Sequence, residues 1–309
     1  MKSSSSLRAV SLAEKIRQGA VLALMHLQRN RAQLFADFDK SMAEYSAILS
    51  RYGRPSLSES KVLEIGFGAR PFRLVWLYNS GVDVWGVDLD KPLLQPSMKS
   101  LVGVIRKNGT ERAVKSLVRY CITDKNQWRQ LGSELKRKGH PFVIPADRLI
   151  VDNAKNPNFW TGLQPLNSIY SDDVFEHIPK EDLTVIAGKM ANALRPKGLA
   201  VIRPMIFTGI CGGHHLEWYP HTINEPTNRK TEPWEHLRKD RFSSNTYLNR
   251  LHRKDYAELF EKYFRILENE IIEPNLGRQF MTQEIRAELS QYSDEDLFTN
   301  SVRFVLEPK

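Results

Sequence analysis

The chain has 309 residues, of which 41% are hydrophobic and 26% charged, so it can form one large domain with additions and has the composition of an ordinary globular protein. No apolar run is long enough to span a membrane, and no secretory signal is expected, because the longest early candidate, residues 20–27, is short and flanked by arginines. The two cysteines form no CxxC pair, so neither a disulfide framework nor a structural zinc site is expected, and a reducing, cytoplasmic setting is inferred.

The net charge of +9 is concentrated in one segment. Residues 91–139 hold 12 Lys and Arg against 3 Asp and Glu, an excess equal to that of the whole chain. Three kinds of anionic partner fit such a segment: an acidic substrate, a lipid surface that is touched peripherally, or nucleic acid. A set of solvated helix faces fits it as well, because charge runs usually lie at the surface.

The first 55 residues are predicted to be a helical extension. Apolar residues recur at spacings of three and four over residues 34–49, which is the period of one helix face. Residues 11–28 are also helix-prone, whereas residues 1–6 are polar and are predicted to be disordered. Residues 54–60, with a proline and several serines, are predicted to link this extension to the main domain.

The rest of the chain, residues 56–309, alternates strands with helices and is predicted to be one domain. Short apolar runs predict seven strands, at residues 61–65, 82–87, 148–151, 168–171, 199–202, 264–272 and 301–306. Helices are predicted after the first strand, at residues 72–79, and before the fifth, at residues 180–194. This alternation indicates an α/β fold, a Rossmann-like and mostly parallel sheet with helices on both faces.

Two segments are longer than an ordinary connection. Residues 91–145 are predicted to be a basic helical insertion after the second strand, with three helices at residues 98–105, 111–119 and 127–138. Residues 205–250, rich in His, Trp and Pro, are predicted to be a loop segment on the substrate side. Long insertions at the carboxyl ends of strands are where open α/β sheets build substrate sites.

The strongest sequence feature is the glycine turn of residues 62–71, which follows the first strand. Such a turn lets the backbone pass close to a ligand, and the next helix offers its amino end. Glu64 precedes the glycines, and Asp88 ends the second strand, where a carboxylate can accept hydrogen bonds from both ribose hydroxyls of a nucleoside. Pro71 stands where a dinucleotide fingerprint has its third glycine, which disfavours a pyrophosphate ligand. A sulfonium ligand has no phosphate and gains from a nearby carboxylate.

Five segments resemble, in order, the successive motifs of class I S-adenosylmethionine-dependent methyltransferases: residues 62–71, 84–89, 151–154, 169–178 and 194–199. The resemblance implies a methyltransferase enzyme with S-adenosylmethionine as its cofactor. It implies a cofactor site made of Glu64, Gly66, Gly68, Asp88, Asp152, Asn153 and Asp172. One departure is Arg70, which stands where the family often has a third glycine, so the shape of the turn is expected to differ.

The family pattern also implies a role for several of these residues. Gly66 and Gly68 are expected to approach the methionine portion of the cofactor, and Asp88 to hold the ribose. Asp152 is expected to face the adenine amino group, and Asn153 to flank the adenine ring. Tight turns and a helix cap would account for the same residue types one at a time, so the prediction depends on their combination.

Methyl transfer to a hydroxyl usually needs a base, and histidine suits that role near neutral pH. His177 follows the fourth strand, whereas His214 and His215 follow two glycines beyond the fifth strand, and these three are the candidate catalytic residues. His177 also fits a packing role, and the other two fit solvated loop histidines. Glu217 and His221 lie near them in sequence, but their spacing matches no dependable ligand pattern, so no metal site is expected.

The alternative base is a carboxylate. Asp172, Asp173 and Glu217 are the acidic residues that lie near the same strand ends. If none of the three histidines proved necessary for turnover, one of these carboxylates would be the next candidate.

Two absent motifs bear on the acceptor. The chain has neither the Asn/Asp-Pro-Pro-aromatic motif of amino-directed nucleic-acid methyltransferases nor a Pro-Cys pair for attack on a pyrimidine, and both absences argue against nucleic acid as a partner. The resemblance is to bacterial methyltransferases of small molecules and glycans, so O-methylation of a sugar or small-metabolite hydroxyl is expected, with an anionic acceptor favoured by the basic insertion. An RNA or protein methyltransferase and a catalytically silent cofactor-binding protein stay open.

A group of aromatic and basic residues in the loop segment has two interpretations. It consists of Trp218, Tyr219, Trp234, His236 and Arg238. These side chains would form a wall on which a sugar ring stacks, or they would be the buried anchor of a long loop.

Overall fold

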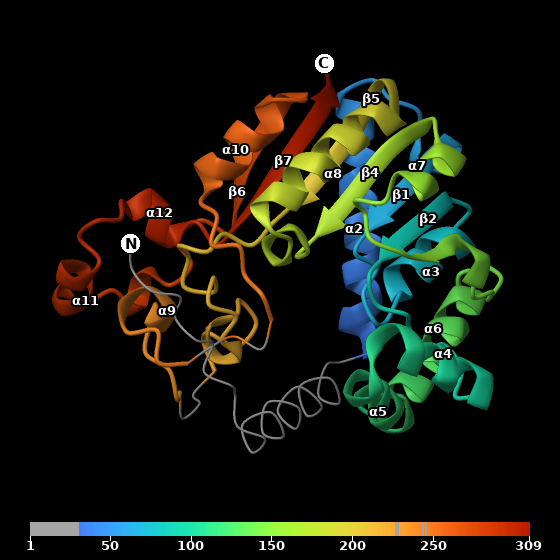
Figure 1. Cartoon of the computed structure of the whole chain (residues 1–309), viewed down its shortest axis with the longest axis horizontal. Coiled ribbons are helices and arrows are strands. Elements are labelled where there is room, and N and C mark those ends of the chain that lie inside the picture. The colour runs from blue at the N-terminus through green and yellow to red at the C-terminus, as the bar shows by residue number, and fades with distance from the viewer. Residues whose placement is uncertain (1–30, 226–228, 243, 245) are drawn as a thin grey trace.

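The computed structural model describes residues 31–225, 229–242, 244 and 246–309, and it is built around one central sheet (Figure 1). The helix predicted for residues 11–28 and the disorder predicted for residues 1–6 lie outside the described residues. The strands are β1 (Lys61–Ile65), β2 (Asp83–Asp88), β3 (Leu149–Val151), β4 (Leu166–Asp172), β5 (Leu194–Arg203), β6 (Phe264–Ile272) and β7 (Ser301–Pro308). All seven predicted strands are therefore confirmed.

The strand order is β3-β2-β1-β4-β5-β7-β6. Strands β1 to β5 pair in parallel, whereas β7 runs antiparallel to both β5 and β6. Strands β2 and β3 follow β1 toward one edge of the sheet, whereas β5 follows β4 toward the other edge. Open α/β sheets bind ligands beyond the carboxyl ends of the strands at such a reversal. The predicted Rossmann-like, mostly parallel fold is confirmed, and the switch point lies between β1 and β4.

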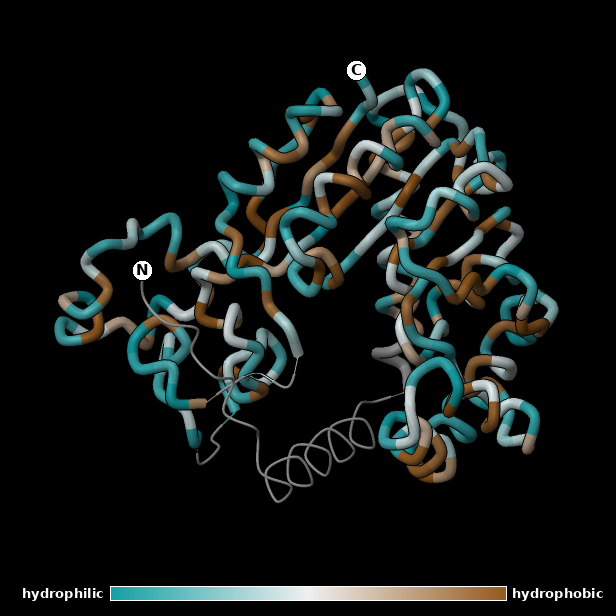
Figure 2. Tube along the Cα trace, in the orientation of Figure 1, coloured by the Kyte–Doolittle hydropathy of each residue, from teal (hydrophilic) through white to brown (hydrophobic). Residues whose placement is uncertain are grey.

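Helices cover both faces of the sheet, as predicted. One face packs against α2 (Arg31–Arg51) and α3 (Phe72–Asn79), and the other against α7 (Pro157–Leu163), α8 (Lys180–Ala193) and α10 (Arg253–Glu261). Successive residues of β5 alternate between the two clusters, Ala200 and Ile202 facing α8 and α10, and Leu199 and Val201 facing α2. Figure 2 shows hydrophobic stretches in the sheet between the two layers of helices, whereas β6, at the edge of the sheet, is only partly buried.

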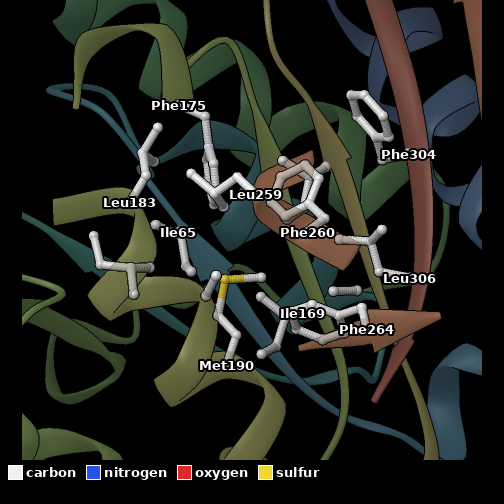
Figure 3. Close-up of a cluster of buried hydrophobic side chains, with 14 of the residues drawn as sticks. Ile65, Ile169, Phe175, Leu183, Met190, Leu259, Phe260, Phe264, Phe304 and Leu306 are labelled. Carbon is white, nitrogen blue, oxygen red and sulfur yellow. The ribbon is translucent and has the colours of Figure 1, made fainter. Parts of the chain in front are cut away.

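The larger of the two clusters lies under α8 and α10. Figure 3 shows Met190 of α8 and Phe260 of α10 pointing at residues of β1, β4 and β7. Burial of each large apolar side chain contributes about 1.5–3 kcal/mol. This cluster fixes the strands and therefore the positions of the polar residues at their ends.

The predicted basic insertion is helical. Its helices are α4 (Met98–Asn108), α5 (Thr110–Arg119) and α6 (Lys125–Arg137), and a π-helical turn at Tyr120–Asp124 joins α5 to α6. Trp128 of α6 meets Phe72 of α3 edge to face, with ring centroids 4.5 Å apart, and Phe35 of α2 stacks on Trp76 of α3 at 5.6 Å. One apolar cluster therefore joins the N-terminal extension, α3 and the insertion. No helix in the described part of the chain is long and apolar enough to cross a membrane.

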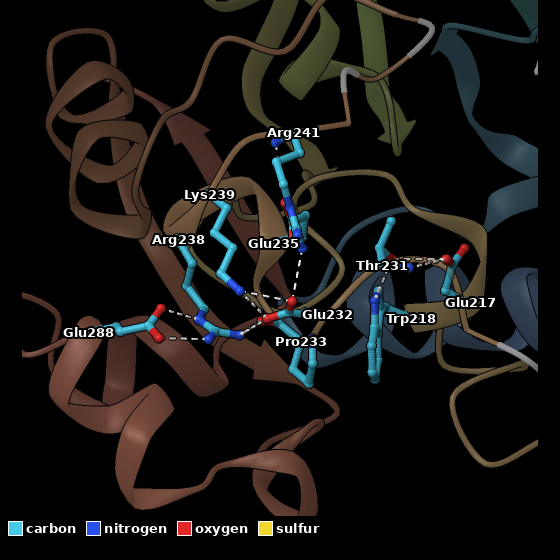
Figure 4. A network of polar contacts seen from close by, with 10 residues as sticks. All are labelled: Glu217, Trp218, Thr231, Glu232, Pro233, Glu235, Arg238, Lys239, Arg241 and Glu288. Atoms are coloured by element: carbon cyan, nitrogen blue, oxygen red, sulfur yellow. Dashed lines mark hydrogen bonds and ion pairs between the residues drawn. The ribbon is translucent and has the colours of Figure 1, made fainter.

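The predicted loop segment forms part of a side lobe, which we define as residues 205–225, 229–242 and 276–298. It contains α9 (Glu235–Arg238), α11 (Gln283–Glu288) and α12 (Asp294–Phe298). Trp218 and Trp234 are fully buried in its apolar cluster. Around them, Glu232 accepts hydrogen bonds from Arg238, Lys239 and Arg241 (Figure 4). These tryptophans anchor the loop, so the interpretation of them as a sugar-stacking wall is wrong.

Candidate functional site

A cavity of about 920 Å³ lies at the carboxyl ends of β1, β4 and β5, against α2. Three predicted cofactor residues, Glu64, Gly66 and Asp172, line it. Its other lining residues include Phe67, Arg73, Asp173, Arg203 and Arg303 from around the sheet and Asp37, Lys40, Ser41 and Glu44 from α2. The cavity therefore lies at the switch point that the sheet topology defines.

Glycine occupies the two positions of the turn, 66 and 68, for different structural reasons. Both have a left-handed backbone, with φ of 84° at Gly66 and 69° at Gly68. A Cβ atom at Gly66 would lie 2.2 Å from Val174 Cγ2, so glycine is needed there to let the chain after β4 pass. Gly68 has open space around its Cα atom, and its N–H donates to Asp88 Oδ2 at 2.8 Å. In the direction of a Cβ atom, Gly68 therefore leaves open space, whereas Gly66 is in contact with Val174.

Asp88 is fixed by the backbone at the end of β2. Its carboxylate accepts hydrogen bonds from the N–H groups of Gly68 and Asp90, each at 2.8 Å. Burial raises its pKa, and these two hydrogen bonds oppose that rise. Because a carboxylate has about four lone-pair sites, the group can still accept hydrogen bonds from ribose hydroxyls.

The two predicted adenine residues lie beside Asp88. Asp152 follows β3, and its backbone N–H donates to the carbonyl of Asp88 at 3.0 Å. Its side chain accepts from Asn156, and the side chain of Asn153 accepts from the N–H of Lys155. Gly68, Asp88, Asp152 and Asn153 do not belong to the described lining of the 920 Å³ cavity. The predicted cofactor residues therefore form two groups, which the turn from Gly66 to Gly68 connects.

Sequence reasoning missed the side chain that joins the carboxylates of the cavity, Arg73. Its guanidinium donates to Glu64 Oε1 at 2.7 Å and also bonds Asp172, which accepts a further hydrogen bond from the Tyr45 hydroxyl at 2.9 Å. Burial raises the pKa of Glu64 against the pull of Arg73. Burial would also raise the pKa of Asp172, but Arg73 and Arg203 outweigh it and hold that pKa below its usual range.

Each of these two carboxylates keeps one oxygen without a hydrogen bond. Glu64 Oε2 and Asp172 Oδ1 are buried and have no partner among the described residues. A buried polar atom without a partner costs about 1–3 kcal/mol. A ligand that brings an ammonium or hydroxyl donor into the cavity would remove that cost, so this part of the cavity fits a donor group.

Helix α2 is part of the site and not only an extension before it. The Tyr45 ring stacks on Tyr170 of β4 with centroids 3.8 Å apart. Glu44 accepts hydrogen bonds from Arg203 of β5 and from Arg303 of β7. The sequence predicted the apolar face of this helix, which contains Tyr45, but gave no signal that its polar neighbour would cover the strand ends.

Asp173 is the acid that follows Asp172 in the cavity lining. Its backbone is left-handed, with φ of 54°, and its N–H donates to the carbonyl of Arg203 at 2.9 Å. The side chain is exposed and belongs to the lining of the cavity. Burial by the surrounding protein and the charge of Asp172 raise its pKa, opposed by Arg203 and Arg73. A raised pKa and access to the cavity suit a proton acceptor.

The three candidate histidines lie elsewhere, since none belongs to the described lining of this cavity. His177 Nδ1 lies 3.0 Å from the carbonyl of Tyr247, and His214 Nδ1 lies 3.0 Å from the Tyr219 hydroxyl. Burial lowers the pKa of all three rings, to about 3 for His214. Their role as bases stays a prediction.

No protein-family model matches the chain, and no curated protein matches it significantly. Among solved structures, it is similar to an S-adenosylmethionine-dependent methyltransferase from Clostridium acetobutylicum, at 12% identity and a TM-score of 0.44, over 95% of this chain and 98% of that one. It is also similar to magnesium protoporphyrin IX methyltransferase from Synechocystis with bound SAH, at 12% identity and a TM-score of 0.41, over 98% of this chain and 90% of that one. A third similar structure is that of geranyl diphosphate C-methyltransferase from Streptomyces coelicolor, at 13% identity and a TM-score of 0.44, over 91% of this chain and 85% of that one.

Proposed function

We propose that the chain is an S-adenosylmethionine-dependent methyltransferase that acts on a hydroxyl of a sugar, glycan or small metabolite. The observation that carries the proposal is the arrangement at the switch point. A glycine turn, with open space at Gly68, is hydrogen-bonded to a carboxylate, Asp88, at the end of the neighbouring strand. This arrangement fits a nucleoside ribose held by Asp88.

The carboxylates of the cavity support the methionine end of the same ligand. The unpartnered oxygens of Glu64 and Asp172 fit the ammonium group of an amino acid, and their negative charge favours a sulfonium nearby. Arg73, which bonds both carboxylates, places a cation in the same lining, so the site suits a zwitterion. Pro71 precedes α3 and has no N–H to offer, which disfavours a pyrophosphate there.

The remaining lining supports a small polar acceptor. Lys40, Glu44 and Arg203 bring charged groups from α2 and β5 to the cavity, and its volume is within the usual range for small-molecule sites. S-adenosylmethionine supplies the methyl group when bound. Asp173, which is open to the cavity and has a raised pKa, would accept the proton that the acceptor hydroxyl loses as its oxygen bonds the methyl carbon.

The test is methyl transfer from S-adenosylmethionine with a tritiated methyl group to separate pools of sugars, sugar nucleotides, RNA and protein. Label that appears in the sugar or small-metabolite pools and resists mild base supports O-methylation of a hydroxyl. Label in RNA or protein alone would indicate that the acceptor is a macromolecule and not a sugar or small metabolite. Cofactor binding without transfer to any pool would leave a cofactor-binding protein and contradict the proposed activity.

A further inference from the structure

A cluster of one carboxylate and two imidazoles lies beyond the end of β4, outside the described lining of the 920 Å³ cavity. Glu176 and His177 belong to the 3₁₀ turn Phe175–His177, and His214 comes from the side lobe. His177 Nε2 lies 3.9 Å from Glu176 Oε1, and His214 Nε2 lies 4.0 Å from the same oxygen. One carboxylate oxygen therefore faces two imidazole nitrogens, contributed by segments almost forty residues apart.

An oxygen atom orients each imidazole by contacting its Nδ1, the nitrogen that faces away from Glu176. The carbonyl of Tyr247 can only accept, so neutral His177 donates to it from Nδ1 and keeps a lone pair on Nε2. The Tyr219 hydroxyl lies in the same relation to Nδ1 of His214, at 3.0 Å. Metal-binding histidines are held in this way, with the outer nitrogen bonded to an oxygen and the inner one left for the ion.

Three of the inner atoms of the cluster, both oxygens of Glu176 and Nε2 of His214, have no hydrogen-bond partner among the described residues. Glu176 is 4% exposed, and its two oxygens make no hydrogen bond of good geometry, although the N–H groups of Glu176 itself and Met205 lie near enough to favour the charged form. His214 Nε2 is likewise buried and unpartnered.

We propose that Glu176, His177 and His214 bind one divalent transition-metal ion of the Zn²⁺ type. Two imidazole nitrogens and one carboxylate oxygen are donors that such ions prefer, whereas Mg²⁺ and Ca²⁺ take oxygen ligands. Ligand atoms of tetrahedral Zn²⁺ lie about 3.4 Å apart, so each of the two measured separations needs to shorten by about half an ångström. Three protein ligands leave a position of the ion open to water.

This site differs from the metal site that the sequence analysis considered and did not expect, which included Glu217 and His221. Glu217, one member of that set, instead accepts hydrogen bonds from Thr231. The spacing of Glu176, His177 and His214 along the chain gives no signal, because the ligands come together only when the side lobe docks on the turn after β4. The proposal does not depend on methyl transfer, since it concerns ion binding alone.

The experiment is a titration of the chelator-treated, full-length protein with Zn²⁺ in competition with a chromogenic chelator. We expect one Zn²⁺ per chain, and at least hundredfold weaker binding in Glu176→Gln, His177→Ala and His214→Ala. His215→Ala is the matched control, because it removes the adjacent imidazole outside the cluster, and its affinity is expected to stay within threefold of the wild type. Co²⁺ should give visible absorption bands that the three ligand variants lose.

The three ligand substitutions also need a check on folding. Glu176→Gln keeps the shape of the side chain and has no charge, so the metal-free variant should melt at nearly the wild-type temperature. Circular dichroism without metal checks this before the titration. Folded wild-type protein that binds no Zn²⁺, or folded ligand variants that bind it as tightly as His215→Ala, would overturn the proposal.

Discussion

At the scale of single residues, Asp173 and the histidines are competing candidates for one role, removal of the acceptor proton. Asp173 lines the cavity and has a raised pKa, whereas His214 lies outside the described lining and has a pKa lowered to about 3. A base acts in its deprotonated form, so the rate falls when the pH drops below its pKa. The two assignments therefore predict different pH profiles.

We expect Asp173→Asn to lower kcat by about a hundredfold or more, because general bases contribute about 10²–10⁴-fold. In the wild type, kcat/KM should fall on acidification through the raised pKa of Asp173, about 6. Steady-state kinetics between pH 4 and 9 checks both expectations, with cofactor affinity as the control that should not change. A rate that stays constant down to pH 4, together with a large loss in His214→Ala, would instead support the histidine.

At the scale of elements, Tyr45 makes two of the contacts that hold α2 to the sheet, the stack on Tyr170 and the hydrogen bond to Asp172. We expect Tyr45→Ala to lower the free energy of unfolding by about 3–5 kcal/mol, since it removes the stack on Tyr170 and leaves a cavity. Tyr45→Phe keeps the ring and loses only the hydrogen bond to Asp172, so its cost should be about 1–3 kcal/mol. Urea denaturation compares the two variants, and equal losses would show that the stack does not hold α2.

The basic insertion is a second element with a testable role. Several of its cations are paired, as Lys138 is with Asp39 of α2 and Arg137 with Glu134. Replacing Lys136, Arg137 and Lys138 with glutamate is expected to raise the apparent KM of an anionic acceptor several-fold and to weaken its dependence on salt, while S-adenosylmethionine affinity stays the same. Kinetics at two salt concentrations gives the comparison. An unchanged KM would indicate that these residues form only a solvated face.

At the scale of the whole molecule, the sheet could be predicted because strand and helix periods are local properties of the sequence. The glycine turn and Asp88 could be placed for the same reason, since the ends of neighbouring parallel strands meet at one edge. The partners of Asp172 could not, because Arg73 is 99 residues away and Tyr45 is 127 residues away. No local pattern tells which long side chains will meet across such separations.

The side lobe illustrates the same limit. Its histidines and tryptophans are residue types that suit catalysis and sugar binding. Whether they face a ligand or a core depends on packing with α11 and α12, about 60 residues further along the chain. The packing buries Trp218 and Trp234, and His214 comes to face Glu176. Composition alone therefore indicated the segment and not the roles of its members.

The central claim is that the switch point binds the nucleoside of S-adenosylmethionine, and calorimetry with S-adenosylhomocysteine tests it most directly. We expect the wild type to bind it and not NADH, and Asp88→Ala to bind it about 5- to 150-fold more weakly, a loss of about 1–3 kcal/mol from charge-assisted hydrogen bonds to the ribose. Asp90→Ala, whose carboxylate bonds Arg112 instead, should bind as the wild type does. Unchanged affinity in a folded Asp88→Ala variant, or binding of NADH in place of S-adenosylhomocysteine, would contradict the claim.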